Sequence, residues 1–374
     1  MLREIDSRLK LATTLVGLMA CASMAQAQTT PQAGTPDAEP TPPPVVTTPS
    51  ASTGSAMMAG TGTAKFNTLL QFWGIEDGTN AYTNYRIRRA ELKVSGNVAP
   101  GTRFSVMADA AKAIPVTATA SAATPPVVTA STTDKVLQDV IIGFSLTDQL
   151  ELVAGQFKPP QTAESLDSAS DLLVPERSIT ARQYSDKREP GVQLNFKSGL
   201  FKAALASTNG KGTNVDDVQT ENEKDLHLRL DYTPMEKVDI GAWTTAGNSG
   251  YDKKARWGAN ARAGLGDLIV RLEGVRAKDL DVYTTGYVAD LGYKFGDFFQ
   301  AVLRYDAIAD LVSGGQQYTA SAATVGLNHL LAKNNAKIQA SFSQLKDMNG
   351  AQGSYTPVKG KEGGLFVLAI QSAM

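Results

Sequence analysis

The chain has 374 residues, 42% of them hydrophobic, and it carries 36 basic and 37 acidic side chains. This length allows one large domain or two ordinary ones. A formal net charge of −1 gives none of the basic excess that indicates nucleic-acid binding, so no nucleic-acid partner is predicted.

The first 27 residues have the pattern of a secretory signal peptide. Basic residues precede an apolar run from Leu11 to Met24, and the small residues of "AQA" follow it, so cleavage is expected after Ala27. The alternatives are lipidation at Cys21 or a short membrane anchor, for which the run is shorter than the ~20 residues of a spanning helix. Because Cys21 is the only cysteine, the cleaved chain would contain no disulfide.

Residues 28–63 are rich in Pro, Thr, Ala and Ser and show no periodic apolar pattern. This composition predicts a disordered or polyproline-like linker. A contact with the cell wall is the alternative role for this segment.

From Ala64 to the end of the chain, apolar and polar residues alternate along sixteen segments. A period of two predicts β-strands, and an even number of strands is expected for a bacterial outer-membrane barrel. The predicted strands are 64–74, 84–97, 102–110, 135–146, 149–157, 190–197, 199–207, 224–233, 236–246, 254–264, 267–276, 283–295, 297–307, 316–330, 334–345 and 363–373.

The connections between these segments alternate in length. Every second one is a tight turn, such as "TD" at 147–148 or "SG" at 198–199, and those in between are longer and more polar. Short periplasmic turns and long outer loops are typical of outer-membrane barrels. A soluble sandwich gives no reason for this rhythm.

The two faces of each predicted strand differ in chemistry. In segment 224–233, Leu226, Leu228 and Leu230 alternate with Arg229 and Asp231. Charges at this density would be costly in a dry core, so one face must meet lipid and the other water. We therefore predict an all-β fold: a transmembrane antiparallel up-and-down β-barrel of about 16 strands over residues 64–374. An extracellular β-sandwich with one polar face is the alternative.

Three segments carry a family resemblance. "NYRIRRAELKVSG" (84–96), "VAGQFKPPQTAESLDSASDLLVPERS" (153–178) and "REPGVQL" (188–194) resemble the phosphate-selective porin O/P family. The resemblance implies a trimeric outer-membrane channel whose lumen arginines and lysines pass small anions such as phosphate. The final strand departs from the usual pattern because it ends in Met374 rather than an aromatic residue.

Three groups of basic residues are the candidate site residues. On the lumen face, the anion pathway is predicted to contain Arg89, Lys93, Arg229, Arg256, Arg262, Arg271 and Arg304. The longest loop, 158–189, is expected to fold inward as a constriction, a solvated surface loop being the alternative; its basic residues are Lys158, Arg177, Arg182, Lys187 and Arg188. Arg86 and Arg88 fall on the lipid face of a regular strand, so they predict either a β-bulge near Arg88 or an outer-rim position beside lipopolysaccharide phosphates.

No enzymatic pattern is evident. The two histidines, His227 and His329, lack metal-site spacing, and there is no Walker loop or G-x-S-x-G elbow. The sequence therefore predicts no enzyme, no metal and no cofactor. It predicts a homotrimeric outer-membrane porin, in contact with lipid and lipopolysaccharide, that passes small hydrophilic solutes with a modest anion preference. A plugged barrel acting as an adhesin or structural protein is the alternative.

Overall fold

A computed structural model describes twelve stretches of the chain within residues 57–374: 57–59, 62–78, 82–114, 117–120, 128–131, 135–210, 212, 224–249, 252–279, 282–313, 316–348 and 362–374. The predicted signal peptide lies outside these residues, as does most of the predicted linker. Within the linker range, Met57–Ala59 form the short strand β1, and strand β2 begins at Gly62.

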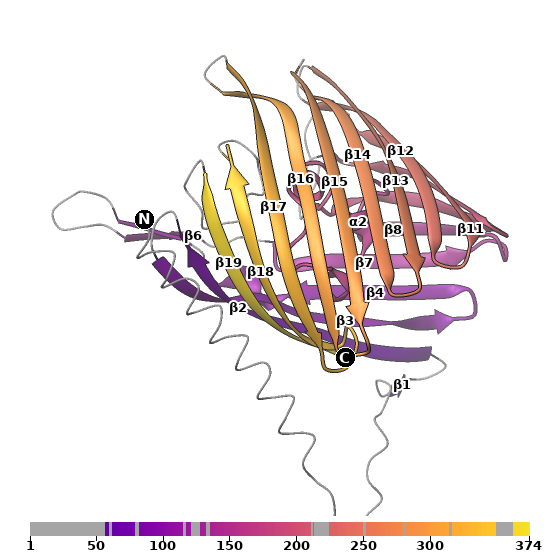
Figure 1. Ribbon diagram of the computed structural model, residues 1–374. Helices are drawn as coiled ribbons and strands as arrows, with labels where there is room; N and C mark the ends of the chain where they lie inside the picture. The colour runs from indigo at the N-terminus through magenta and orange to yellow at the C-terminus, as the bar shows by residue number, and fades with distance from the viewer. Residues whose placement is uncertain are drawn as a thin grey trace, which may run out of the picture. The chain divides into compact units, whose positions relative to one another are not determined.

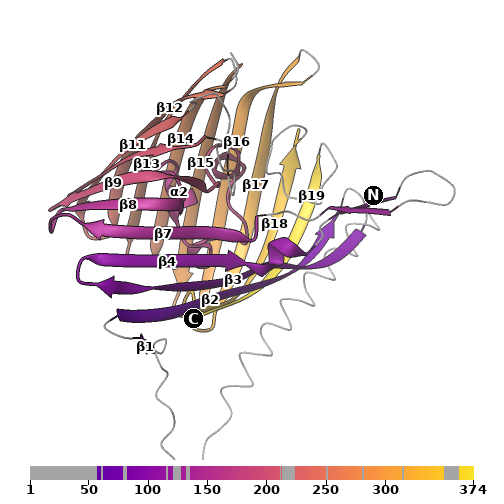
Figure 2. The same ribbon diagram turned by 180° about the vertical axis from the view of Figure 1, so that it is seen from behind.

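Sixteen strands in the described part of the chain close into one antiparallel barrel (Figures 1 and 2), which confirms the predicted fold class. Each strand pairs with the next one along the chain, and β19 closes the ring on β2, with Ile370 opposite Phe72. The barrel strands are β2 (Gly62–Asp77), β3 (Tyr82–Ala99), β4 (Thr102–Asp109), β7 (Leu137–Ser145), β8 (Leu150–Phe157), β9 (Glu189–Ser198), β10 (Phe201–Thr208), β11 (Asp225–Met235), β12 (Val238–Ser249), β13 (Asp252–Leu265), β14 (Leu268–Asp279), β15 (Val282–Phe295), β16 (Phe299–Ser313), β17 (Gln316–Leu330), β18 (Ala336–Lys346) and β19 (Gly363–Ala373).

The alternation of side chains decides which face of each strand lies inside. Along β11, Leu228 is 40% exposed on the outer surface, whereas Arg229 is 5% exposed and lies inside. Residues 226 and 230 repeat the outward apolar position, because successive side chains of a strand point to opposite faces. The outer surface of the barrel is therefore apolar.

One end of the barrel carries the tight turns that the sequence predicts. Gly199 and Gly266 occupy two of them with positive φ angles of 55° and 61°, a conformation that glycine adopts without steric cost. The hairpins β9–β10 and β13–β14 can therefore reverse within two residues.

At the opposite end, several strands run further than predicted. β12 continues to Ser249 and β16 to Ser313, where the sequence analysis placed loops from residues 247 and 308. The alternation fades there, yet the paired backbone continues as hairpins, Ser313 facing Gln316. The connections at 247–253, 277–282 and 308–315 are consequently shorter than predicted.

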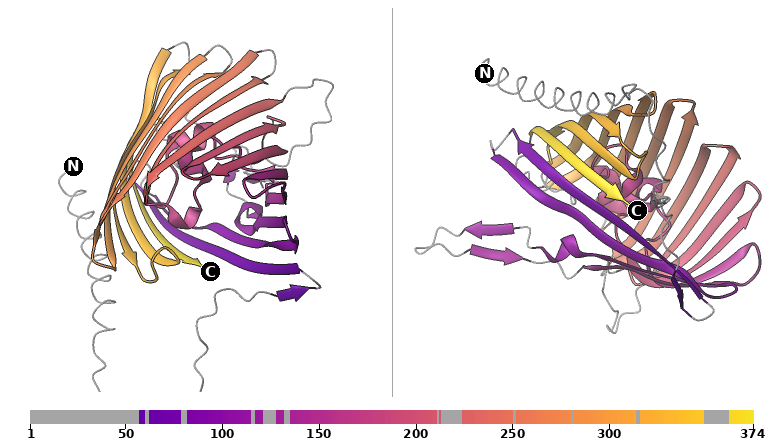
Figure 3. Two further views of the ribbon diagram at one scale, coloured as in Figure 1. Left: turned by 90° about the vertical axis from the view of Figure 1, so that its right-hand side faces the viewer. Right: turned by 90° about the horizontal axis from the view of Figure 1, so that it is seen from below.

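Two further features interrupt the simple barrel. The connection from β4 to β7 contains a 3₁₀-helix, η1 (Ala110–Ala113), and the hairpin β5 (Thr117–Ala120) and β6 (Val128–Ser131). The connection from β8 to β9 contains α2 (Ala163–Leu166), η2 (Ala169–Asp171) and α3 (Ile179–Tyr184), and Figure 3 shows these short helices surrounded by strands. None of the helices in the described residues is long and apolar enough to cross a membrane.

The interior is not uniformly polar. Inward side chains of β2, β12, β14 and β16 to β19, such as Ile75, Val275 and Ile308, form an apolar cluster with Ile179 and Tyr184 of α3. Burying these residues against the wall contributes favourably at about 25 cal/mol per Å² of apolar surface. The cluster fixes α3 to one side of the lumen, and this asymmetry leaves space on the other side.

Candidate functional site

The connection 158–188, here called the inward loop, lies inside the barrel. Most of its side chains are buried, Ile179 and Thr162 among them, although polar residues outnumber apolar ones along it. A buried polar segment needs partners for its backbone and side chains. Those partners come from the barrel wall.

Arg304 on β16 makes the most buried of these contacts. Its guanidinium donates to Asp290 at 2.6 and 2.8 Å, to Glu164 of α2 at 2.5 Å and to the carbonyl of Glu176 at 3.0 Å. Its side chain is fully buried. Since Asp290 belongs to β15, one arginine joins two wall strands to two points of the inward loop.

Four more predicted lumen arginines also hold the inward loop. Arg229 donates to the Gln161 carbonyl, and Arg256 donates to the Tyr184 carbonyl at 2.9 Å. Arg262 and Arg271 reach the two carboxylate oxygens of Asp167 at 2.8 and 3.5 Å. These arginines face inward as the alternation predicts, but they lie against the loop and are not free in the lumen.

Neutral and basic residues of β17 and β18 complete the attachment. Lys337 donates to the Leu172 carbonyl at 2.7 Å, Asn328 to the Leu173 carbonyl at 2.8 Å, and Gln339 to the latter at 3.2 Å. The sequence analysis did not identify these positions as site residues, nor Glu164, Asp167 and Glu176. The inward face of Asn328, Lys337 and Gln339 was the available signal for the wall residues, yet nothing in the sequence shows which wall the loop touches.

A β-bulge lies at Arg88. Gln71 of β2 pairs with Arg89, and the next residue, Phe72, pairs with Ile87, so Arg88 has no partner across the strand pair. The extra residue lets two consecutive arginines turn inward, because a bulge interrupts the alternation. Arg86 also lies on the inner face, with its guanidinium 5.8 Å from the centre of the Trp73 ring.

These arginines converge on one carboxylate of the inward loop. Glu176 accepts from Arg88 at 2.7 Å and from Arg89 at 2.9 Å, and Arg182 of α3 lies 3.9 Å away. Burial alone would raise the pKa of Glu176, but the three guanidinium groups outweigh it and hold the pKa well below its ordinary value. A single negative charge is therefore surrounded by three positive ones.

A cavity of about 640 Å³ remains between the inward loop and the wall formed by β2, β3, β4 and β7. We call it the main chamber. Among the described residues, charged side chains dominate its lining: Arg88, Arg89, Lys93, Lys112, Lys158, Arg177 and Arg188 are basic, and Glu91, Asp109, Asp139, Asp167 and Asp186 are acidic. It also touches Asn335 and Met374 at the tight-turn end, so it extends along the lumen.

The basic residues of the inward loop take different positions. Lys158, Arg177 and Arg188 line the main chamber, whereas Arg182 lies beside Glu176 and Lys187 is exposed at the end of the loop. Arg188 pairs with Asp139 at 2.6 Å. Burial, and then the nearby Arg177, lower the pKa of the Lys158 ammonium to about 7.

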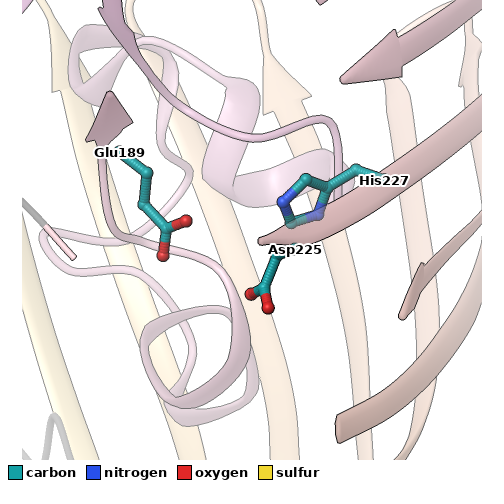
Figure 4. A group of neighbouring side chains, drawn as sticks. All are labelled: Glu189, Asp225 and His227. Atoms are coloured by element: carbon teal, nitrogen blue, oxygen red, sulfur yellow. The ribbon is translucent and has the colours of Figure 1, made fainter. Parts of the chain in front are cut away.

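One cluster near the loop end has the residue types of a metal site. Figure 4 shows Glu189 of β9 beside Asp225 and His227 of β11. All three are buried, and one carboxylate oxygen of each acid and one ring nitrogen of the histidine lie within 4.8 Å of one another. The ring nitrogens of His227, however, lie 3.0 Å from the Thr208 hydroxyl and 2.9 Å from the Thr245 hydroxyl.

The two carboxylates of this cluster are also engaged. Glu189 accepts from the Thr208 hydroxyl at 2.5 Å and from the Gly210 amide at 3.0 Å, and Lys254 donates to Asp225. The remaining oxygen of Asp225 lies against Gly247, where even a Cβ atom would collide with it. That oxygen has no hydrogen-bond partner among the described residues, but the rest of the donor set is used by a hydrogen-bonded network across β9 to β13, which fits a structural role better than a metal site.

Comparisons with known proteins agree with this architecture. The profile of the family described as phosphate-selective porin O and P matches residues 71–277. No curated protein matches the chain.

Many solved structures match, at low sequence identity. They include the trimer form of OmpT, an outer-membrane protein of Vibrio cholerae (TM-score 0.59, 11% identity, 84% of this chain and 99% of that one). They also include the outer-membrane channel DcaP of Acinetobacter baumannii (0.56, 10%, 86% and 99%) and an anion-selective porin from Comamonas acidovorans (0.54, 12%, 84% and 100%). At such identities these likenesses establish the barrel fold.

Proposed function

The chain belongs to the phosphate-selective porin O and P family, and we propose that it forms a water-filled outer-membrane channel for passive diffusion of small hydrophilic solutes, with a modest preference for anions. The main chamber is the observation that carries this proposal. Its polar lining and its length along the lumen suit hydrated solutes, and they favour a channel over a plugged barrel that serves as an adhesin.

The charge of the main chamber supports an anion preference. Its described lining contains seven basic and five acidic side chains, named above. Glu176, which lies behind Arg88 and Arg89, reduces the excess to one positive charge while Lys158 is protonated. In a narrow passage such charges lie within a Debye length of about 8 Å of the moving ion, so even a small excess biases permeation.

Arg89 and Lys93 are, in this proposal, the wall residues of the anion pathway, and Lys158, Arg177 and Arg188 are its loop residues. Arg256, Arg262, Arg271 and Arg304 act mainly by seating the inward loop. Phosphate is the anion that the family's description names, and we propose it as a candidate solute on that ground alone.

The remaining assignments extend the same proposal. The pattern of residues 1–27 supports export through a cleaved signal peptide, and the apolar outer face supports contact with lipid and lipopolysaccharide. A similar barrel has been solved in a trimer form, which supports a homotrimer. Nothing in the described chain favours an enzymatic role over a channel.

The test is a planar-bilayer recording of the purified full-length protein across a KCl gradient. Stepwise conductance is expected, with a zero-current potential that shows chloride more permeant than potassium. Silence would refute the channel, and a potential of the opposite sign would refute the anion preference.

A further inference from the structure

The lumen contains a second cavity, which we call the side chamber. It measures about 420 Å³ and lies along the inner face of β8 to β11, near the tight-turn end. Its lining includes Glu151, Lys197, Lys202 and Arg229. The main chamber and the side chamber share two described lining residues, Lys158 and Leu166.

Leu166 is unusual for its position. It is the last residue of α2, and the three residues before it are buried, yet Leu166 itself is 41% exposed within the lumen. Leaving an apolar side chain in water forgoes about 25 cal/mol per Å² of the burial free energy that packing would provide. An apolar side chain that meets water on two sides narrows the path between them and resists wetting, as hydrophobic constrictions in channels do.

Lys158 fixes the place of this leucine. Its ammonium group donates to the carbonyl of Ser165, the residue before Leu166, and lies 3.6 Å from Asp186. The contact joins the first residue of the inward loop to the end of α2. Lys158 is thus a positioning residue, and Leu166 is the group that stands between the chambers.

We propose that Leu166 is a size-determining residue of the channel: it separates the side chamber from the main chamber and sets the effective width of the lumen at their junction. The inference rests on the proposed channel function and names a residue that controls it. Shortening Leu166 joins the two spaces, and enlarging it closes the junction further.

Joining the chambers also brings a solute near the charges of the side chamber. Lys197 and Lys202 are paired across β9 and β10 and lie on the wall of the side chamber. Like charges directly opposite each other are unfavourable in a sheet, so this pair attracts anions from the lumen. Asp148, Glu151 and Asp231 of the same lining balance this pair and Arg229, so a merged lumen admits larger solutes at an unchanged net charge.

The experiment compares Leu166→Ala, Leu166→Trp and the unmodified protein, each folded in detergent and checked by heat-modifiable migration. Single-channel conductance and liposome swelling with neutral sugars of increasing size are measured. Leu166→Ala is expected to raise conductance about 1.5-fold and to admit larger sugars, and Leu166→Trp is expected to lower both. Leu200→Ala is the matched control, because Leu200 is an exposed leucine in the β9–β10 turn outside the described lining of both chambers.

The outcomes separate the two proposals. If the unmodified protein forms channels, and both Leu166 variants have the same conductance and sugar cut-off as it does, the size-determining role is overturned and the channel function stays intact. A change of equal size in Leu200→Ala would overturn it as well. A silent unmodified protein would overturn the channel function, and this inference with it.

Discussion

Replacing Arg304 by leucine is expected to release the inward loop while the barrel stays folded. The substitution removes four hydrogen bonds and leaves the carboxylates of Glu164 and Asp290 buried without their common partner. Removing one partner of a buried ion pair costs about 3–5 kcal/mol, chiefly because an uncompensated charge remains.

This penalty destabilises the seated position of the inward loop and leaves the barrel itself unaffected. Glu164 regains water if α2 leaves the wall, and Asp290 regains water through the space that opens, whereas the strand pairing of β15 and β16 is unchanged. A penalty of about 3–5 kcal/mol shifts the balance between the seated and the released loop by roughly two to four powers of ten. The contacts of Lys337, Asn328 and Gln339 with Leu172 and Leu173 remain to limit the movement.

Two measurements check this expectation. Conductance of Arg304→Leu should rise and become noisier, and trypsin should cut the inward loop after Arg177 or Arg182, which are largely buried while the loop is seated. The matched control is Arg103→Leu, since Arg103 pairs with Glu151 on the wall at a partly exposed site, where such a pair contributes about 0–1 kcal/mol. Unchanged conductance together with an uncut loop in Arg304→Leu would refute the reasoning.

Two further predictions concern the outer face and pH. Leu228→Arg should impair assembly, because an arginine on the lipid face costs about 2–4 kcal/mol at the bilayer midplane. The control, Gln193→Arg on the inner face, should assemble normally. Equal yields of folded barrel for the two variants on heat-modifiable gels would contradict the assignment of the faces. The anion preference should fall between about pH 6 and about pH 8, because the lowered pKa of Lys158, about 7, leaves this side chain cationic below that value and neutral above it. Lys158→Arg should weaken this pH dependence, since arginine stays charged, and the remainder comes from Lys112 of the same lining, whose pKa burial lowers to about 8. An equally steep change of the zero-current potential in that variant would exclude Lys158 as a source.

The barrel could be predicted from the sequence because lipid and water impose opposite requirements on alternate residues. In β11 the leucines at 226, 228 and 230 are enough to fix which face lies outside. The same argument weakens beyond the membrane, where both faces meet water, and the loop-end extensions of β12 and β16 were missed for that reason.

The candidate site was less predictable, since it depends on where the inward loop rests. The alternation of side chains along a strand places Arg262 and Arg304 inside the barrel. It does not show that two acids far away in the sequence neutralise them, Asp167 at Arg262 and Glu164 at Arg304. Conversely, Lys112 lines the main chamber from η1, a segment without strand periodicity. Contacts between a loop and a wall are long-range, and the local pattern of a single sequence does not encode them.

The bulge at Arg88 has a consequence for how this wall can change. Removing one residue from a regular strand turns every side chain on one side of the cut to the opposite face. Removing Arg88 would instead leave Ile87 outside and Arg89 inside, because their partners Phe72 and Gln71 are already neighbours. The strand can therefore lose one positive charge at this point by a single-codon deletion, without disturbing the register of the barrel around it.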